Sequence, residues 1–189
     1  MNILVIHPND PTTQFLTILY KDLQNVVKLD EHNSNKEIVH EIKSNKYDLI
    51  MMLGHGGEDG LYAPNGQQQF GRSIINSTHV QFLRDKLCFG IWCNANIFAD
   101  KYYLDGIFSG MVISELYEAS MWNIPVKDQE ELTNHTKLWT EVLHNAFHYT
   151  GMKNIPQFMS DYIKDKKDIT LLEDFNFNSI YYYIKGECQ

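Results

Sequence analysis

The stretch Tyr47-Asp48-Leu49-Ile50-Met51-Met52-Leu53-Gly54-His55-Gly56-Gly57 decides the fold that this chain is expected to take. It is a run of apolar residues that stops abruptly at a histidine set between glycines. A second run, Leu87-Cys88-Phe89-Gly90-Ile91-Trp92-Cys93-Asn94, has the same form and stops at a cysteine. Short uninterrupted apolar runs are typical of strands buried on both faces, as in parallel sheets. The two runs therefore predict two strands at the centre of an α/β domain.

Strand and helix patterns alternate along the rest of the chain. Further strands are predicted at residues 2–8, 26–29, 110–115 and 178–184, and helices at residues 10–23, 34–42, 77–87, 96–104, 128–147 and 156–163. Helix starts are marked by Asp10 before Pro11, by Ser77, and by the spaced pairs Ser34/Glu37 and Asp128/Glu131. The β-α-β-α-β order predicts parallel strands joined by right-handed crossovers. We therefore expect one domain over residues 1–189, with a mostly parallel sheet between helices.

The composition narrows the class of partner. The formal net charge is −8 and no Lys/Arg cluster is present, so a nucleic-acid partner is not expected. No apolar run approaches the roughly 20 residues of a membrane span, and residues 1–8 lack the basic leader of a signal peptide. Three cysteines without framework spacing indicate free thiols in a reducing compartment. These features predict a cytoplasmic protein without a membrane partner.

His55 and Cys93 each follow a predicted buried strand directly. In a parallel sheet the carboxyl ends of neighbouring strands lie about 4.8 Å apart on one edge, where active groups gather. An imidazole and a thiol brought together there can act as general base and nucleophile. The alternatives without catalytic chemistry are a histidine that only forms part of a turn and a cysteine that is part of the core. Cys88, five positions before Cys93, points to the opposite face and is interpreted as structural.

The segment after His55 changes character. Gly56, Gly57 and Gly60 open a glycine-rich stretch to residue 71, and an uncovered Gly56 N–H is a plausible oxyanion donor. The Asn65-Gly66 pair between Leu61-Tyr62 and Gln69-Phe70 predicts a small hairpin. A loop at this edge of the sheet suits binding, and Arg72 is its one basic residue.

Taken together, these residues resemble a known family. An apolar strand ending in His-Gly, then one ending in Cys 38 residues later (93 − 55), resembles the caspase, gingipain and clostripain clan of cysteine peptidases. His55-Gly56-Gly57 is close to the clostripain-like form. So is Met111-Val112-Ile113-Ser114-Glu115 followed by Met121-Trp122, where a strand ending in Ser-Glu precedes a loop with tryptophan. The resemblance covers about residues 1–125.

The resemblance implies a caspase-like sheet, itself flavodoxin-like, and a hydrolase of the thiol protease class. It makes His55 the base and acid, Cys93 the nucleophile, and the Gly56 and Cys93 amides the oxyanion donors. Neither a metal nor a cofactor is implied, and the substrate is a protein or peptide. Many members of this clan are latent until they are activated, so the resemblance also implies activation by a partner, a ligand or self-association.

The substrate pocket is expected at six residues by the same resemblance and by loop position: Glu58, Asp59, Ile91, Ser114, Glu115 and Trp122. Clostripain-like enzymes carry an acidic residue two positions before the cysteine, where it selects a basic side chain. That position is Ile91 here, so this specificity does not transfer. Glu58, Asp59 and Glu115 favour a basic or polar group if they line the pocket.

Other classes of function stay open at this point. One is a catalytically inactive caspase-like module that binds or regulates. Another is a flavodoxin-like domain for a small ligand without covalent chemistry, which predicts that His55 and Cys93 lie far apart or are buried away from any cleft. His144 and His148 have the spacing of metal ligands on a helix, but the glutamate of H-E-x-x-H is missing and a half-exposed helix face explains them better.

Overall fold

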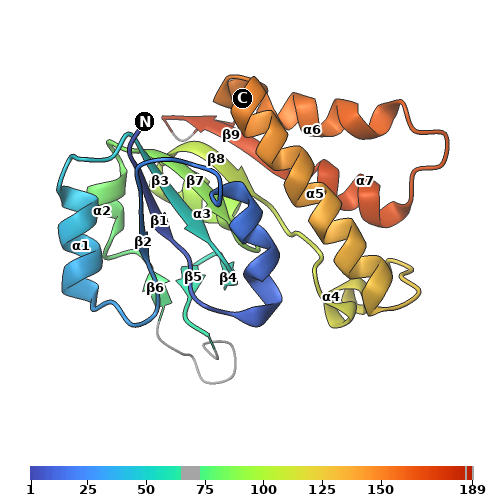
Figure 1. The fold of residues 1–189 in the computed structure, drawn as a ribbon, viewed down its shortest axis with the longest axis horizontal. Coiled ribbons are helices and arrows are strands. Elements are labelled where there is room, and N and C mark those ends of the chain that lie inside the picture. The colour runs from blue at the N-terminus through green and yellow to red at the C-terminus, as the bar shows by residue number, and fades with distance from the viewer. Residues whose placement is uncertain (65–72, 186, 189) are drawn as a thin grey trace.

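The computed structural model describes residues 1–64, 73–185 and 187–188. Its main sheet has seven strands in the order β10-β9-β8-β7-β3-β1-β2 (Figure 1). The strands are β1 (Ile3–Ile6), β2 (Val26–Leu29), β3 (Leu49–Leu53), β7 (Leu87–Ile91), β8 (Asp105–Ser109), β9 (Ile180–Ile184) and β10 (Glu187–Cys188). Neighbours from β2 to β8 pair in parallel, whereas β9 is antiparallel to β8 and β10 to β9. The parallel part has the strand order of a flavodoxin-like sheet.

Helices cover both faces of the sheet, as Figure 1 shows. One face packs against α1 (Asn35–Lys43), α2 (Val80–Leu83) and α3 (Ala95–Tyr102). The other packs against the 3-10 helix η1 (Pro11–Leu19) and against α5 (Gln129–Tyr149) and α6 (Ile155–Lys164). Alternate residues of each central strand enter the two cores, because successive side chains of a strand point to opposite faces. The predicted α/β architecture, a mostly parallel sheet between helices, is confirmed.

A small second sheet projects from the carboxyl edge of the main one. It consists of β4 (Gly56–Gly57), β5 (Gly60–Tyr62) and β6 (Ser73–Ile75), all antiparallel. In Figure 1 it lies at the lower end of the strands, at the same end as α4 (Leu116–Met121). Among the described residues, the next strand after Leu61-Tyr62 is β6. The predicted Asn65-Gly66 turn, its partner Gln69-Phe70 and Arg72 lie outside the described residues.

The predicted strand at residues 110–115 is wrong. The strand here is β8, and at Gly110 the chain leaves the sheet, where the Gly110 N–H donates to Ser179 O at 2.7 Å. Beyond it, a buried side chain replaces the ladder: Asn176 Oδ1 accepts from Ile113 N at 2.8 Å, and Asn176 Nδ2 donates to Ile113 O at 3.0 Å. The apolar run predicted burial correctly for two residues: Val112 enters the core that α5 covers, and Ile113 enters a third core cluster with Ala119 of α4 and Leu132 of α5.

Helix boundaries follow the capping signals in part. The side chains of Asp10, Ser34 and Asp128 cap η1, α1 and α5 as predicted. The first helix is of 3-10 type and ends at Leu19, and α2 starts after His79 without a side-chain cap, so Ser77 does not cap it. Three short helices were not predicted: α4, η3 (Met152–Asn154) and α7 (Leu171–Phe177).

Candidate active site

The strands that carry His55 and Cys93 are parallel neighbours. Leu53 of β3 is the register partner of Ile91 of β7, and Gly54 N donates to Ile91 O at 3.0 Å just beyond. His55 and Cys93 each follow their strand's last paired residue by two positions. The two side chains therefore leave the sheet at matched places on its carboxyl edge.

Both side chains also emerge on the same face. Met51 and Leu53 on β3, and Phe89 and Ile91 on β7, enter the core that η1 and α5 cover. Alternation carries that face on to His55 and Cys93, which line one small cavity of about 20 Å³. The remaining side chains of its wall are mostly apolar: Thr13, Phe15, Leu16, Ile91, Trp92, Val112, Ser114 and Trp139. His55 and Cys93 therefore border the same cavity, which does not fit a small-ligand domain in which the two side chains lie far apart.

Trp92 holds the glycine segment against the end of β7. A Cβ on Gly56 would come within 2.2 Å of Trp92 Cδ1, and Trp92 Nε1 donates to Gly57 O at 3.0 Å. Gly54 adopts a φ of +143°, in the region that favours glycine. The glycines around His55 are thus required by a close approach and by a backbone turn.

Two backbone amides are available where an oxyanion donor is expected. Tyr62 N donates to His55 O at 2.8 Å, so the Gly56–Leu61 pair has the non-hydrogen-bonded geometry and the Gly56 N–H points away from β5. Within the described part of the chain, the Cys93 N–H has no hydrogen-bond acceptor. The next residue, Asn94, has a φ of 65° and turns the chain sharply into α3.

His55 is held by a hydroxyl and faces a carboxylate. Its Nε2 lies 2.6 Å from Thr12 Oγ1 and 3.8 Å from Glu115 Oε1, and its side chain is only 13% exposed. Thr12 Oγ1 in turn donates to Asp10 Oδ1 at 2.7 Å. The imidazole thus sits at the end of a hydrogen-bonded chain that starts at the N-cap of η1.

The Cys93 thiol is protonated at neutral pH in this conformation. Burial raises its pKa to about 12, and the Glu118 carboxylate, with Oε1 3.8 Å from Sγ, adds to the rise. The Val112 backbone N–H opposes both effects only in part. Glu118 is itself fixed, because its Oε2 accepts from Ser114 N at 2.8 Å and from Glu115 N at 3.1 Å. The first turn of α4 thus holds a carboxylate against the sulfur.

An open groove of about 500 Å³ adjoins the cavity. It runs between η1 and the segment from Ser114 to α5, and it shares Phe15 and Ser114 with the cavity wall. The other lining residues are mainly polar: Pro11, Thr12, Glu115, Tyr117, Gln129, Thr133 and Thr136. Thr12 and Glu115, the two contacts of His55 Nε2, both line the groove, so a bound chain would lie against the residues that surround the imidazole.

Three of the six residues predicted for the substrate pocket lie at this place. Ile91 and Ser114 line the cavity, and Glu115 lines the groove. The structure does not bring the other three together with them: Glu58 and Asp59 are exposed, and Asp59 Oδ1 lies 3.5 Å from Lys101 Nζ. Trp122 packs on Phe175, with 5.3 Å between ring centroids.

Sequence reasoning missed Thr12 and Glu118, and it assigned Asp10 only a capping role. A signal for Asp10 and Thr12 exists, because the loop after the first strand borders the place where the strand order reverses, a usual ligand site in such sheets. Glu118 has only a weak signal, its spacing of three residues from Glu115 at the start of α4.

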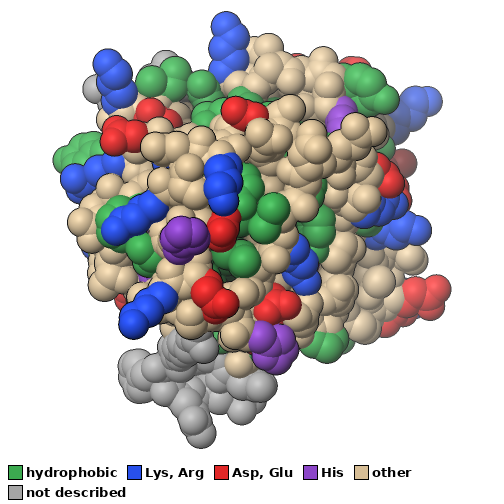
Figure 2. All heavy atoms as spheres, turned by 60° about the vertical axis from the view of Figure 1, so that its left-hand side comes forward, with side chains coloured by type: hydrophobic (Ala, Val, Ile, Leu, Met, Phe, Trp, Pro, Cys, Tyr) green, Lys and Arg blue, Asp and Glu red, His purple; other side chains and the backbone are tan. Residues whose placement is uncertain are grey.

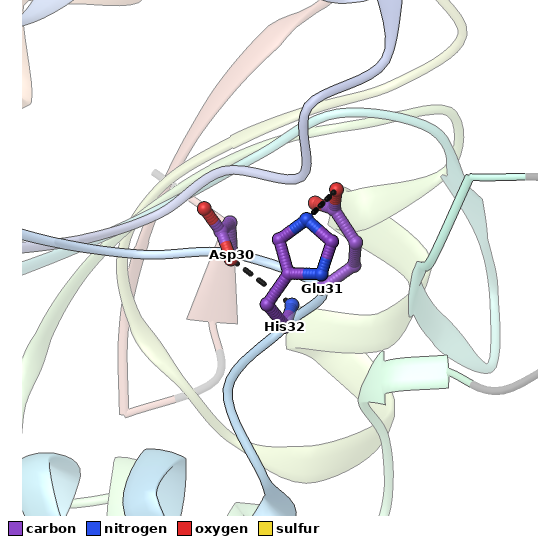
Figure 3. Close-up of side chains that lie close together, drawn as sticks. All are labelled: Asp30, Glu31 and His32. Carbon is purple, nitrogen blue, oxygen red and sulfur yellow. Dashed lines mark hydrogen bonds and ion pairs between the residues drawn. The ribbon is translucent and has the colours of Figure 1, made fainter.

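Candidate metal ligands occur elsewhere on the surface. Asp30, Glu31 and His32, which follow β2, have ligand atoms within 4.8 Å of one another (Figure 3). Internal contacts explain the arrangement, since His32 Nε2 lies 3.2 Å from Glu31 Oε1 and Asn9 Nδ2 donates to Asp30 Oδ2 at 2.9 Å. The His144 and His148 rings lie 4.3 Å apart, and no third ligand joins them among the described residues.

The surface and the cysteines add two facts. Acidic and basic side chains are interspersed on the face drawn in Figure 2, and no helix in the described part of the chain combines the length and apolar character needed to cross a bilayer. All three cysteines are free: Cys88 is buried, Cys93 half-buried and Cys188 exposed.

No protein-family model matches the sequence, and no curated protein matches it either. The chemistry of the site therefore has to be derived from its own residues. Those residues are an imidazole and a thiol at matched strand ends, the backbone amides of Gly56 and Cys93, and two carboxylates, Glu115 at 3.8 Å from His55 Nε2 and Glu118 at 3.8 Å from Cys93 Sγ.

Proposed function

We propose that the chain is a cysteine endopeptidase with a caspase-like fold, in which His55 is the general base and acid and Cys93 the nucleophile. The observation that carries the proposal is the matched placement of the two side chains beyond β3 and β7, on one face and along one cavity. A mixed sheet with a parallel centre and an antiparallel edge is compatible with that fold.

The chemistry uses groups already in place. His55 takes the thiol proton of Cys93, and the sulfur attacks a peptide carbonyl carbon to form a C–S bond. The carbonyl oxygen becomes an oxyanion that the Gly56 and Cys93 N–H groups stabilise. The C–N bond then breaks as the imidazolium returns its proton to the leaving amine. Water, deprotonated by His55, attacks the thioester and releases the acid and the free thiol.

The groove beside His55 is the proposed binding site for the peptide. Its lining includes hydroxyl and amide side chains, which can pair with the N–H and C=O groups of an extended peptide main chain. Glu115 is the charged group of the lining and favours a basic or polar side chain in the substrate. Glu58, Asp59 and Trp122 do not line this groove.

The conformation described here is a resting state of the proposed enzyme. A thiol with a pKa of about 12 yields almost no thiolate at neutral pH. Burial is the larger cause and Glu118 the next, so a movement of α4 that takes Glu118 away and opens the site to water would lower the pKa of Cys93. A partner, a ligand or self-association that shifts α4 would have this effect.

The same observation favours the second candidate, a catalytically inactive module of the same fold that binds or regulates. In that case Glu118 is a permanent part of the wall and no condition makes Cys93 reactive. The two candidates differ in whether the reactivity of Cys93 depends on His55.

Iodoacetamide labelling at pH 7 tests this dependence. All variants carry Cys188→Ala, because Cys188 is exposed and would react on its own, while buried Cys88 is the internal control. With Glu118→Gln added to remove the contribution of the carboxylate to the raised pKa, we expect Cys93 to be labelled faster than with Glu118 in place, and His55→Ala to slow that labelling at least about tenfold. Labelling that is equally slow with and without His55 would support the inactive module.

Cleavage of a peptide library by the Glu118→Gln variant tests the activity itself. We expect defined cuts that Cys93→Ala and His55→Ala both abolish. Cuts that persist in Cys93→Ala would come from another source and would contradict the proposal.

A further inference from the structure

Three residues from two segments form a short hydrogen-bonded chain at the candidate site. His55 Nε2 lies 2.6 Å from Thr12 Oγ1, and Thr12 Oγ1 lies 2.7 Å from Asp10 Oδ1. Asp10 Oδ1 also accepts from Thr12 N at 3.0 Å, as the N-cap of η1. The carboxylate is therefore anchored by the backbone, and it fixes the hydroxyl that meets the imidazole.

The number of protons on each group decides which one donates in these hydrogen bonds. A threonine hydroxyl has one proton to donate, and an ionised carboxylate can only accept. The Thr12 proton therefore points to Asp10, and the oxygen is left to accept a proton from His55 Nε2. Glu115 Oε1 lies 3.8 Å from the same nitrogen, beyond hydrogen-bonding distance, but its negative charge also favours hydrogen on Nε2. The hydroxyl that accepts and the nearby carboxylate thus both favour a proton on Nε2.

A neutral imidazole carries one proton, so a proton on Nε2 leaves the lone pair on Nδ1. We infer that Asp10 and Thr12 are positioning residues that hold His55 in the Nε2–H tautomer, so that Nδ1 is the atom that takes and returns the Cys93 proton. This role rests on the proposed peptidase chemistry, and it extends the pair of reacting residues to an Asp–Thr–His–Cys set.

The hydrogen-bonded chain Asp10–Thr12–His55, called the relay below, lies where this role requires it. Asp10 and Thr12 follow β1, which is the direct neighbour of β3, so the relay and His55 belong to adjacent strand ends. Thr12 also lines the groove, and a peptide bound there would shield the hydrogen bonds from water. The relay would therefore be strongest when substrate is present.

Four variants separate this role from a structural one. Thr12→Val removes the hydroxyl while keeping the shape, and Thr12→Ser keeps the hydroxyl. Asp10→Asn keeps a good N-cap residue but removes the charge. Thr17→Val is the matched control, because Thr17 is on the same helix and its hydroxyl donates to Gln14 O, at 2.7 Å, and has no other partner among the described residues.

The direct measurement is ¹⁵N NMR of the His55 ring, assigned with His55→Gln, at a pH where the ring is neutral. We expect the wild type, Thr12→Ser and Thr17→Val to show hydrogen on Nε2 that exchanges slowly with water. Thr12→Val should speed that exchange about tenfold or more and mix the tautomers, and Asp10→Asn should have a smaller effect in the same direction.

The second measurement is the rate of Cys93 alkylation by iodoacetamide in the Cys188→Ala, Glu118→Gln background. We expect about a tenfold loss in Thr12→Val, with recovery in Thr12→Ser. A wild-type ring with hydrogen on Nδ1, or Nε2 exchange that Thr12→Val leaves unchanged, would overturn the inference. If the NMR result holds while alkylation never depends on His55, the relay stands and the peptidase proposal fails.

Discussion

At the scale of single residues, the state of the thiol depends on its immediate surroundings. Burial is the larger cause of the raised pKa of Cys93, and no single substitution removes it. The Glu118 carboxylate is the next cause, and it can be neutralised without loss of its backbone contacts, since a glutamine oxygen still accepts from Ser114 N and Glu115 N. Glu118 is therefore the residue at which the resting state can be perturbed.

Glu118→Gln should lower the pKa of Cys93, because a thiolate forms more easily beside a neutral amide than beside a carboxylate. Each pKa unit corresponds to about a tenfold change in thiolate at neutral pH. The measurement is the pH dependence of Cys93 alkylation between pH 7 and 11. Glu141→Gln, on the exposed side of α5, is the control. An unchanged pH profile in Glu118→Gln would contradict the electrostatic role.

Gly56→Ala should destabilise the fold by about 2 kcal/mol, because the added methyl overlaps both Trp92 Cδ1, at 2.2 Å, and Gly60 O, at 2.5 Å. Gly151→Ala is the matched control, since its nearest heavy atom would be 3.9 Å away. Urea unfolding of the two variants checks the difference. Equal stability would mean that β4 does not pack on Trp92 as described.

At the scale of elements, the path of residues 110–115, which form neither helix nor strand, depends on one side chain of α7. Asn176 belongs to α7 and is completely buried, and it makes both hydrogen bonds of the Ile113 peptide groups. This contact anchors the chain two residues before Glu115, the N-cap of α4, whose capping box joins Glu115 and Glu118. An element that contributes no reacting group thus holds the segment that leads into the two carboxylates.

Asn176→Ala should cost about 3 kcal/mol of folding free energy, because it leaves the buried Ile113 N–H and C=O without partners. Asn178→Ala is the matched control, since Asn178 is exposed and bonds only to Asp174. Urea unfolding gives both values. Because α4 would be released, Cys93 alkylation should also accelerate in Asn176→Ala, and a slower reaction would contradict the coupling between α7 and the site.

At the scale of the whole molecule, both sides of the fold bury histidines. Burial lowers the pKa of His7 and of His135 to about 4. It also lowers the pKa of His79 and of His144. In the unfolded chain these side chains bind protons near pH 6.5, so between pH 6.5 and 4 the unfolded state binds more protons than the folded one. Stability is therefore present above pH 6.5 and is lost as the pH falls.

Each of His7 and His135 should contribute about 3 kcal/mol to this loss by pH 4, at about 1.4 kcal/mol per pKa unit. The measurement is urea unfolding at pH 7 and at pH 4.5. His7→Gln should reduce the difference between the two values, whereas His32→Gln should not, because the His32 side chain is 81% exposed. A free energy of unfolding that is equal at the two pH values would contradict neutral burial.

Local signals were enough for most of the architecture. The apolar runs of β3 and β7 predicted buried strands, because a strand covered on both faces needs apolar residues throughout. The oxygen-bearing side chains of Asp10, Ser34 and Asp128 predicted helix starts, because a helix cap is satisfied within three residues. The same locality failed at residues 110–115, where an apolar run can be buried by a sheet or by helices alike.

The sequence by itself determined the α/β class, the central parallel strands and the delivery of His55 and Cys93 to one edge, since all three follow from periodicity and chain order. Only the tertiary structure decided what surrounds those two side chains. Thr12 meets His55 from 43 positions away and Glu118 meets Cys93 from 25, and such contacts depend on how η1 and α4 pack against the sheet. Periodicity reports which residues are buried, but the partner of a hydroxyl or a carboxylate is set by the packing of whole elements.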